Sequence, residues 1–249
     1  MSEVVIAIHD VHLAFPLVRF RPAGIKEAFL KRLLGRGTGE DQKFWALRGI
    51  ELSITRGEVI GLVGKNGSGK STLLRVITGI YAPDRGTVET KGRISSLLEL
   101  GAGFREELSG DENITLNGAI LGYSPQEMAQ LRPGIVEFSG LGEFMAQPLR
   151  TYSSGMRARL GFAVAAAVRP DILIIDEALA VGDAEFRAKS MARIEALTAD
   201  QNTTVVIVSH NEAELRRLCT RLVLLERGQV VISGDAETVF GRYRPAGPT

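Results

Sequence analysis

The chain is very poor in the residues that form disulfides and metal clusters. It has one cysteine, Cys219, and three histidines in 249 residues. A single cysteine cannot form an internal disulfide, and the three histidines are too scattered to have metal-ligand spacing. We therefore expect neither a disulfide framework nor a structural metal centre.

Long apolar runs are also missing. The longest uninterrupted stretches, such as residues 163–168, are far shorter than the roughly eighteen residues needed to cross a bilayer. The opening residues, MSEVVIAIHD, have no basic segment followed by an apolar one, which argues against a secretory signal. We expect a cytosolic chain that does not cross a membrane by itself.

No charge of one sign dominates the sequence. The 30 lysines and arginines nearly balance the 29 aspartates and glutamates, so there is no strong field to attract nucleic acid, and we expect no nucleic-acid partner. A chain of 249 residues fits one large domain or one domain with an inserted subdomain.

The most informative feature that the chain does contain is a glycine loop at residues 64–71, GKNGSGKS, which fits the pattern GxxxxGKS. An apolar run precedes the loop and a helical pattern follows it, which predicts strand, loop and helix. Small residues let backbone N–H groups close around a phosphate tail, and the helix adds the positive end of its dipole. We expect Lys70 to reach the outer phosphates and Ser71 to offer its hydroxyl to Mg²⁺. The candidate nucleotide-binding residues of this segment are Gly64, Lys65, Asn66, Gly67, Ser68, Gly69, Lys70, Ser71 and Thr72.

The apolar runs predict a mainly parallel sheet. Residues 171–176 (DILIID) and 203–208 (TTVVIV) are continuous apolar strands, typical of strands buried on both faces, and helical patterns separate them. The predicted fold class is α/β: a P-loop NTPase core with a mainly parallel sheet, an N-terminal antiparallel β part and an inserted helical subdomain. Ligand is expected at the carboxyl ends of the parallel strands.

The pattern along the chain divides this single domain further. We assign residues 1–96 and 159–240 to the core and residues 97–158 to the helical subdomain. Within the core, residues 87–100 predict a strand pair, and residues 221–232 predict a hairpin that turns at Arg227 and Gly228.

An interruption rich in basic residues separates the N-terminal strands at residues 4–8 and 50–54. Residues 25–36 within it have the spacing of a short basic amphipathic helix. This helix either packs on its own domain or docks at a membrane surface or a partner.

Charged and polar residues follow the predicted parallel strands. Asp176 ends the strand DILIID, where a Mg²⁺ that bridges two phosphates needs an acidic partner, and Glu177 follows at once. We expect Asp176 in the metal shell and Glu177 as the group that polarises the attacking water. His210 follows the next strand, in VVIVSH, where an imidazole can hydrogen-bond the γ-phosphate or the water.

A second phosphate cradle is predicted at YSSGM, residues 152–156, which opens a strongly helical segment. Ser153 or Ser154 can cap this helix, so that its first N–H groups face an anion. One nucleotide needs only one cradle from one side, and a second cradle therefore suggests that two copies meet head to tail. The alternative is a plain helix cap.

The motifs GKNGSGKS, YSSGMRARLGF, DILIIDE and the histidine of VSH, in this order, resemble the ATP-binding subunit of ABC transporters over nearly the whole chain. LLELGAGFREELSGDENI, YSSGM and DEALAVGD resemble, more closely, the ATPases that export bacterial surface polysaccharide such as O-antigen, capsule or teichoic acid. The resemblance implies ATP and Mg²⁺ as ligands and an ATP-dependent dimer in which Ser154 and Gly155 contact the γ-phosphate of the other copy. It also implies that Asp183 belongs to the loop that couples the two sites.

The resemblance implies a separate transmembrane permease and a peripheral place at the cytoplasmic face of the plasma membrane. It also implies an aromatic that stacks on adenine, for which Phe15 is the candidate and Trp45 or Phe44 the rivals. The family's usual glutamine between core and helical subdomain is not evident, and Glu99 is the nearest polar residue for its metal and water contacts. We expect no C-terminal carbohydrate-binding domain.

Three alternatives remain open on the sequence. The first is an ABC exporter for another cargo, such as a lipid, drug or peptide. The second is an ABC ATPase without a transport role. The third is a P-loop kinase outside the ABC group, in which YSSGM would be only a helix cap.

Overall fold

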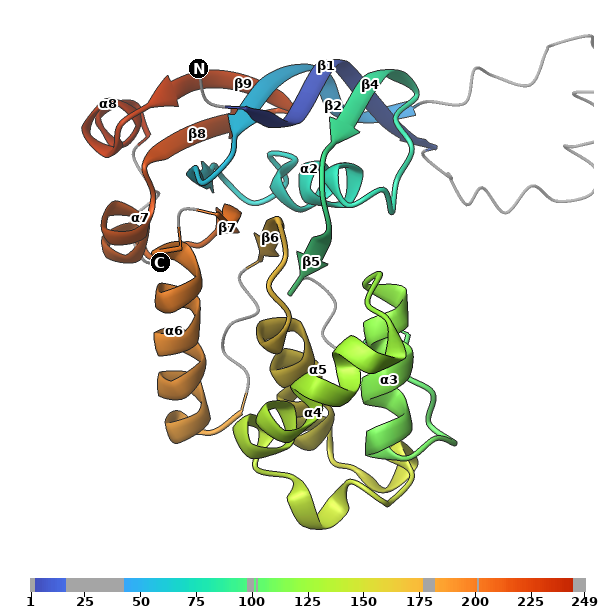
Figure 1. The fold of residues 1–249 in the computed structure, drawn as a ribbon. Helices are drawn as coiled ribbons and strands as arrows, with labels where there is room; N and C mark the ends of the chain where they lie inside the picture. Colours follow the sequence, from blue (N-terminus) through green and yellow to red (C-terminus); the bar gives the residue numbers. More distant parts are fainter. Residues whose placement is uncertain are drawn as a thin grey trace, which may run out of the picture.

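The structure is a computed structural model, and it describes residues 3–16, 43–97, 101, 103–176, 182–200 and 202–243. Within these ranges the chain forms two β-sheets and a lobe of helices (Figure 1). The predicted amphipathic helix at residues 25–36, Glu99 and Glu177 lie outside the described residues.

The N-terminal sheet is antiparallel and has three strands in the order β2-β1-β4. They are β1 (Val4–Pro16), β2 (Lys43–Thr55) and β4 (Arg85–Thr90). The inner faces of β1 and β2 carry alternating buried residues, as expected of a sheet with one solvated face. This arrangement confirms the antiparallel β part predicted from the sequence, with strands longer than the apolar runs at residues 4–8 and 50–54.

The predicted strand pair at residues 87–100 is wrong. β4 pairs with β1, whereas the next strand, β5 (Ile94–Ser96), belongs to the other sheet and lies parallel to β6 (Ile172–Ile175). Gly92, between them, has a φ of +105°, a left-handed turn that turns the chain from one sheet to the other. Two short strands close in sequence look like a hairpin, but here each finds a partner far along the chain.

The central sheet has six strands in the order β5-β6-β7-β3-β8-β9. It contains β3 (Val59–Val63), β6 (Ile172–Ile175), β7 (Thr204–Val208), β8 (Arg221–Glu226) and β9 (Gln229–Gly234). β3, β6 and β7 are buried at every position, because helices cover them and apolar side chains fill both faces. All pairings are parallel except β8 with β9, which confirms the hairpin; it turns at Arg227 and Gly228, both with positive φ.

The described core also contains four helices, of which the last follows the last strand. They are α2 (Lys70–Ile77), α6 (Ala184–Thr198), α7 (Glu212–Leu218) and α8 (Ala236–Arg242). α2 lies between the two sheets in Figure 1, and its buried residues include Leu73, Leu74 and Ile77. Its core cluster joins residues of β1 and β2 to residues of β3 and β6, so that α2 holds the antiparallel sheet on the parallel one.

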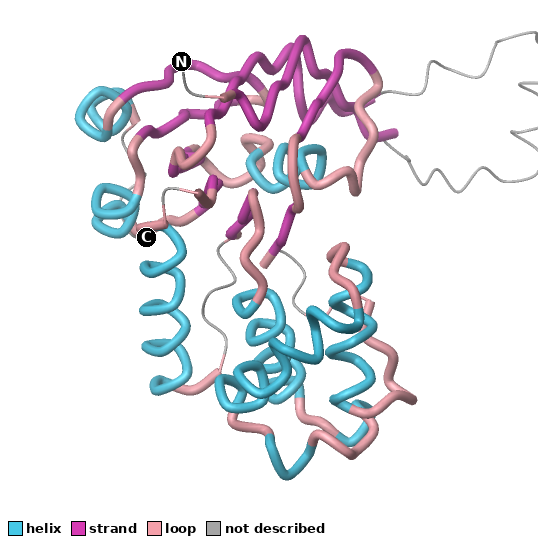
Figure 2. Tube along the Cα trace, in the orientation of Figure 1, coloured by secondary structure: helices cyan, strands magenta, loops and turns pink. Residues whose placement is uncertain are grey.

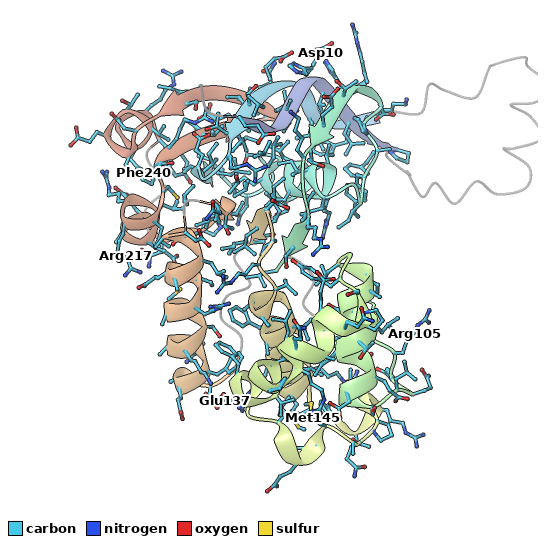
Figure 3. The ribbon with its side chains drawn as sticks, viewed as in Figure 1. Asp10, Arg105, Glu137, Met145, Arg217 and Phe240 are labelled. Atoms are coloured by element: carbon cyan, nitrogen blue, oxygen red, sulfur yellow. The ribbon has the colours of Figure 1, made fainter. Side chains whose placement is uncertain are left out.

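The helical lobe follows β5 along the chain and appears as the cyan group at the lower end of Figure 2. It consists of α3 (Gly110–Ile120), α4 (Pro125–Ser139), the short 3-10 helices at Gly142–Phe144 and Leu149–Thr151, and α5 (Ser154–Ala167). The lobe has its own apolar core, which includes Met145, labelled in Figure 3, and extends to Val168 at the end of α5. α5 therefore runs across the position at which the sequence divided the subdomains. Within the described residues, no helix is both long and apolar enough to span a bilayer.

Candidate functional site

Three neighbouring strand ends bring the predicted site residues together. The glycine loop follows β3, Asp176 follows β6 and His210 stands just beyond β7, and these strands are adjacent and parallel. A pocket of about 260 Å³ lies at this edge of the sheet. It is lined by Asn66, Gly67, Gly69, Lys70, Ser71, Thr72, Asp176, Val208 and His210.

The glycine loop adopts a backbone that only glycine tolerates at two positions. Gly64 has a φ of +151°, and a Cβ there would lie 2.3 Å from the Leu225 carbonyl oxygen. Gly69 has a φ of +109°, and its Cβ would lie 2.8 Å from the Ala46 carbonyl oxygen. The two glycines therefore let the loop pack closely against the surrounding backbone.

The loop is supported by a segment that sequence reasoning did not connect with it. The backbone N–H of Gly228 donates to the Ser68 carbonyl oxygen at 2.9 Å, and the N–H of Arg48 donates to the Gly228 carbonyl oxygen at 2.8 Å. The sequence predicts the turn at Gly228 but gives no signal of this contact, because the partners lie 160 residues apart in the chain.

Lys70 is held at the floor of the pocket. Its side chain is 8% exposed, and its ammonium donates to the carbonyl oxygens of Gly64 at 2.7 Å and Lys65 at 3.2 Å. Burial lowers the pKa of Lys70, and the nearby charge of Asp176 opposes this shift. A cation in this position lacks the water that solvates an exposed lysine, and an anionic ligand would compensate for that loss.

Two oxygen-bearing side chains that suit a hard cation stand together at the pocket wall. The Ser71 hydroxyl donates to Asp176 Oδ2 at 3.2 Å. A hydroxyl and a carboxylate are the oxygen donors that Mg²⁺ takes in nucleotide sites. The residues present therefore fit a Mg²⁺ that is also bound to phosphates.

The loop itself also fits a phosphate group. Ser68 Oγ is buried and has no hydrogen-bond partner among the described residues. α2 begins without a side-chain cap, whereas the other described α-helices, α3 to α8, each have a side-chain cap at the N-terminus. An uncapped helix end beside a buried ammonium and an unpaired hydroxyl is a group of hydrogen-bond donors that suits a phosphate.

YSSGM lies elsewhere in the chain's own fold. Ser153 caps α5, accepting a hydrogen bond from the Met156 N–H at 3.2 Å, and both Ser153 and Ser154 are exposed. Neither serine nor Gly155 is among the residues that line the pocket in the described part of the chain. Within one copy, YSSGM and the pocket are therefore separate.

The remaining candidates are placed as follows. Asp183 caps α6, accepting a hydrogen bond from the Phe186 N–H at 2.8 Å.

The Phe15 ring packs edge-on against Tyr81 at a centroid distance of 5.5 Å, and Trp45 is 37% exposed with its ring edge-on to His12. Phe15 pairs with Phe44 across the β1–β2 ladder, and none of these three aromatic rings lines the pocket of the described residues. The roles of Phe15, Trp45 and Asp183 toward nucleotide, and those of Glu99 and Glu177, stay predictions.

Comparison with known proteins agrees with this site. The model of the ABC transporter family matches residues 47–180. The O-antigen export system ATP-binding protein RfbB of Klebsiella pneumoniae is 42% identical over 98% of this chain and 99% of its own length. The ABC transporter protein AbcA of Aeromonas salmonicida is 46% identical over 98% and 77% of the two chains. The chain belongs to the ABC transporter family and is an ATPase of the ABC type.

Relatives from other bacteria and a solved structure complete the comparison. The teichoic acids export ATP-binding protein TagH of Lactiplantibacillus plantarum is 38% identical over 98% of this chain and 65% of its own. A dimeric ATP-binding cassette in a post-hydrolysis state, bound to ADP and Pi, superposes with a TM-score of 0.69 at 21% identity, covering 93% of this chain and 98% of that one. This likeness confirms the predicted fold class.

Proposed function

We propose that the chain is the ATP-hydrolysing subunit of an exporter of lipid-linked surface polysaccharide, such as O-antigen. In this proposal two copies act with a separate transmembrane permease at the cytoplasmic face of the plasma membrane. The observation that carries the ATP-binding part of the proposal is the group of donors around the glycine loop: buried Lys70, unpaired Ser68 Oγ and the uncapped start of α2.

The glycine loop would hold the phosphates of ATP. Lys70 would turn from the Gly64 and Lys65 carbonyl oxygens toward the outer phosphates, and the first N–H groups of α2 would bind the phosphate oxygens between them. Ser71 and Asp176 would hold Mg²⁺. When bound, the ion neutralises the charge that develops on the phosphates. Phe15 or Trp45 would stack on the adenine.

Hydrolysis would depend on the residues beyond the ends of β6 and β7. Glu177 follows Asp176 directly and is the candidate to polarise the attacking water. His210, which lines the pocket, would hydrogen-bond the γ-phosphate and hold it in line with that water. Glu99 is the candidate for the metal and water contacts made from the linker after β5.

The separation of YSSGM from the pocket supports an arrangement of two copies head to tail. The start of α5 in one copy, with Ser153, Ser154 and Gly155, would cover the γ-phosphate held by the other copy. Asp183 at the start of α6 would then lie near the shared interface. Two nucleotides would close the dimer, and hydrolysis would open it, provided that ATP binds the closed state more tightly than the open one.

The cargo rests on the relatives. RfbB proteins carry the name O-antigen export system ATP-binding protein and TagH proteins the name teichoic acids export ATP-binding protein, and they align with nearly all of this chain. We extend this function to the chain, with a permease as its partner. The basic segment at residues 25–36 is the candidate for contact with that partner or with the membrane surface.

The test is to purify the tagged chain from native membranes in mild detergent and to identify the proteins that accompany it. The proposal expects a stoichiometric multi-span membrane protein and an ATPase rate that is higher in the complex than in the free chain. Lys70→Ala serves as the control, because it should retain the partner and lose the ATPase activity. Recovery of the chain alone, or with ribosomes, from the soluble fraction would instead support an ABC ATPase without a transport role.

A further inference from the structure

A cluster of polar side chains connects the helical lobe to the edge of the central sheet opposite the nucleotide pocket. Arg56, Arg93 and Asp171 stand just before β3, β5 and β6, whereas the glycine loop and Asp176 follow β3 and β6. The three strands are parallel members of one sheet, so this cluster lies at their amino ends.

Arg93 contacts both parts of the molecule. Its backbone N–H donates to Asp171 Oδ2 at 2.8 Å, which fixes its main chain to the core. Its guanidinium reaches into the lobe, where Nη1 donates to Glu127 Oε1 at 3.1 Å and Cζ lies 4.4 Å from the centroid of the Tyr123 ring. A planar guanidinium that is paired with a carboxylate and stacked on a ring has its orientation fixed. The ammonium of a lysine would not be fixed in this way.

The partners of Arg93 are themselves held in place. Glu127 accepts from the Ser124 N–H at 2.7 Å as part of the capping box of α4. These backbone and hydroxyl contacts with Ser124, together with Arg93, lower the pKa of Glu127 from its ordinary 4.5 to about 2. The Tyr123 hydroxyl donates to the Arg169 carbonyl oxygen at 3.2 Å, between the end of α5 and β6. The Arg93 side chain therefore meets partners that hydrogen bonds of their own hold in place.

The position of this clamp, defined as Arg93 with Tyr123 and Glu127, matters because of α5. The clamp lies beside Arg169, just past the C-terminal end of α5, while YSSGM is at the N-terminal end. A helix of 14 residues is about 21 Å long, so a rotation of about 5° at one end moves the other by about 2 Å. Errors of about 1 Å in the position of a catalytic group can slow a reaction about 100-fold.

We propose that Arg93 is a positioning residue, because the clamp sets the orientation of the helical lobe on the core. That orientation in turn sets the position of YSSGM relative to the nucleotide of the partner copy. This inference rests on the proposed function for the partner's nucleotide, but the orientation of the lobe can be measured in one copy alone.

The test measures that orientation in the full chain with two spin labels. Cysteines replace Glu89 on β4 and Glu143 in the lobe, both exposed, in a Cys219→Ser background. Pulsed electron spin resonance then gives the distribution of distances between core and lobe. The variants are Arg93→Ala and Glu127→Gln, since glutamine retains the hydrogen bonds of a capping box but not the charge. Glu127→Gln also serves as the test variant if Arg93→Ala does not fold.

Arg132→Ala is the matched control. Arg132 is 47% exposed against 46% for Arg93, and it also pairs with a carboxylate, Asp111, at 2.7 Å. Both members of that pair belong to the lobe, on α4 and α3, so its loss should not alter how the lobe sits on the core. Thermal unfolding of all variants separates a loss of stability from a loss of orientation.

We expect Arg93→Ala to broaden the distance distribution and Glu127→Gln to broaden it less, with Arg132→Ala matching the parent. Introduced into Glu177→Gln, Arg93→Ala should weaken ATP-driven dimerisation about 10-fold and change the affinity of one copy for ATP less than twofold.

Distance distributions equal to those of the parent in both clamp variants would overturn the proposal, as would broadened distributions with unchanged dimerisation. If Glu177→Gln itself stays monomeric with ATP, the proposed function fails in its dimer, and the distance distribution alone decides whether the clamp orients the lobe.

Discussion

At the residue scale, the site depends on a few side chains held away from water. Lys70 donates hydrogen bonds to carbonyl oxygens of the same glycine loop with which it is expected to bind phosphate, and burial lowers its pKa. An ammonium so placed is ready to exchange carbonyl partners for phosphate oxygens, which are better acceptors because they are charged. Its contribution should therefore appear in ligand binding.

Lys70→Ala should weaken ATP binding by about 10- to 100-fold, because it removes charge-assisted hydrogen bonds worth about 1.5–3 kcal/mol. Titration calorimetry with Mg·ATP measures the affinity, and circular dichroism checks the fold. Lys91→Ala is the control: Lys91 is an exposed lysine just past the end of β4, and its removal should leave the affinity unchanged. An equal affinity for Lys70→Ala and the parent would remove Lys70 from the phosphate site.

Gly69→Ala should destabilise the folded chain by about 1–3 kcal/mol, because its φ of +109° is strained for alanine and the new Cβ would meet the Ala46 carbonyl oxygen. Gly134→Ala, within α4, gives the opposite expectation. A Cβ there meets nothing within 4 Å, and alanine favours a helix over glycine by up to about 1 kcal/mol. Urea unfolding of the two variants should give shifts of opposite sign.

At the element scale, much of the fold could be predicted from the chain. β3, β6 and β7 are short continuous apolar runs, and α2 follows a glycine loop whose spacing is specific. The strand pair at residues 87–100 could not be predicted, because β4 and β5 pair with strands about 80 residues away in the chain. The contact of Gly228 with the glycine loop and the contact of Arg93 with Glu127 are likewise tertiary contacts that leave no periodic pattern in the sequence.

The junction between β5 and α4 should depend on pH through Glu127. A carboxylate whose pKa in the folded chain is lowered to about 2 stabilises the fold fully above its unfolded pKa near 4.5, and this stabilisation is lost as the pH falls from 4.5 to 2. The difference in melting temperature between the parent and Glu127→Gln should therefore be largest above pH 5 and shrink below it. Glu143→Gln, elsewhere in the lobe, is the control, and a difference that grew in acid would contradict the assignment.

At the scale of the whole molecule, the pocket and the proposed second anion site at YSSGM lie apart within one copy, as the proposed two-copy arrangement requires. The glycine loop and Asp176 form a pocket at the carboxyl ends of the strands, while Ser154 and Gly155 are placed on a separate lobe. The sequence motifs predict both sites. That the two sites lie apart within one copy follows only from the three-dimensional arrangement of lobe and core.

The central claim, that ATP joins two copies with YSSGM facing the partner's nucleotide, is tested most directly by light scattering of Glu177→Gln with Mg·ATP. The account predicts twice the monomer mass with ATP, the monomer mass without it, and ATP hydrolysis slowed about 100-fold or more. Adding Gly155→Asp should keep the chain monomeric: a Cβ at Gly155 lies 3.9 Å from Ser153 Oγ, so the side chain fits one copy, but its charge repels phosphate. A monomer of Glu177→Gln with ATP, or a dimer that tolerates Gly155→Asp, would contradict the account.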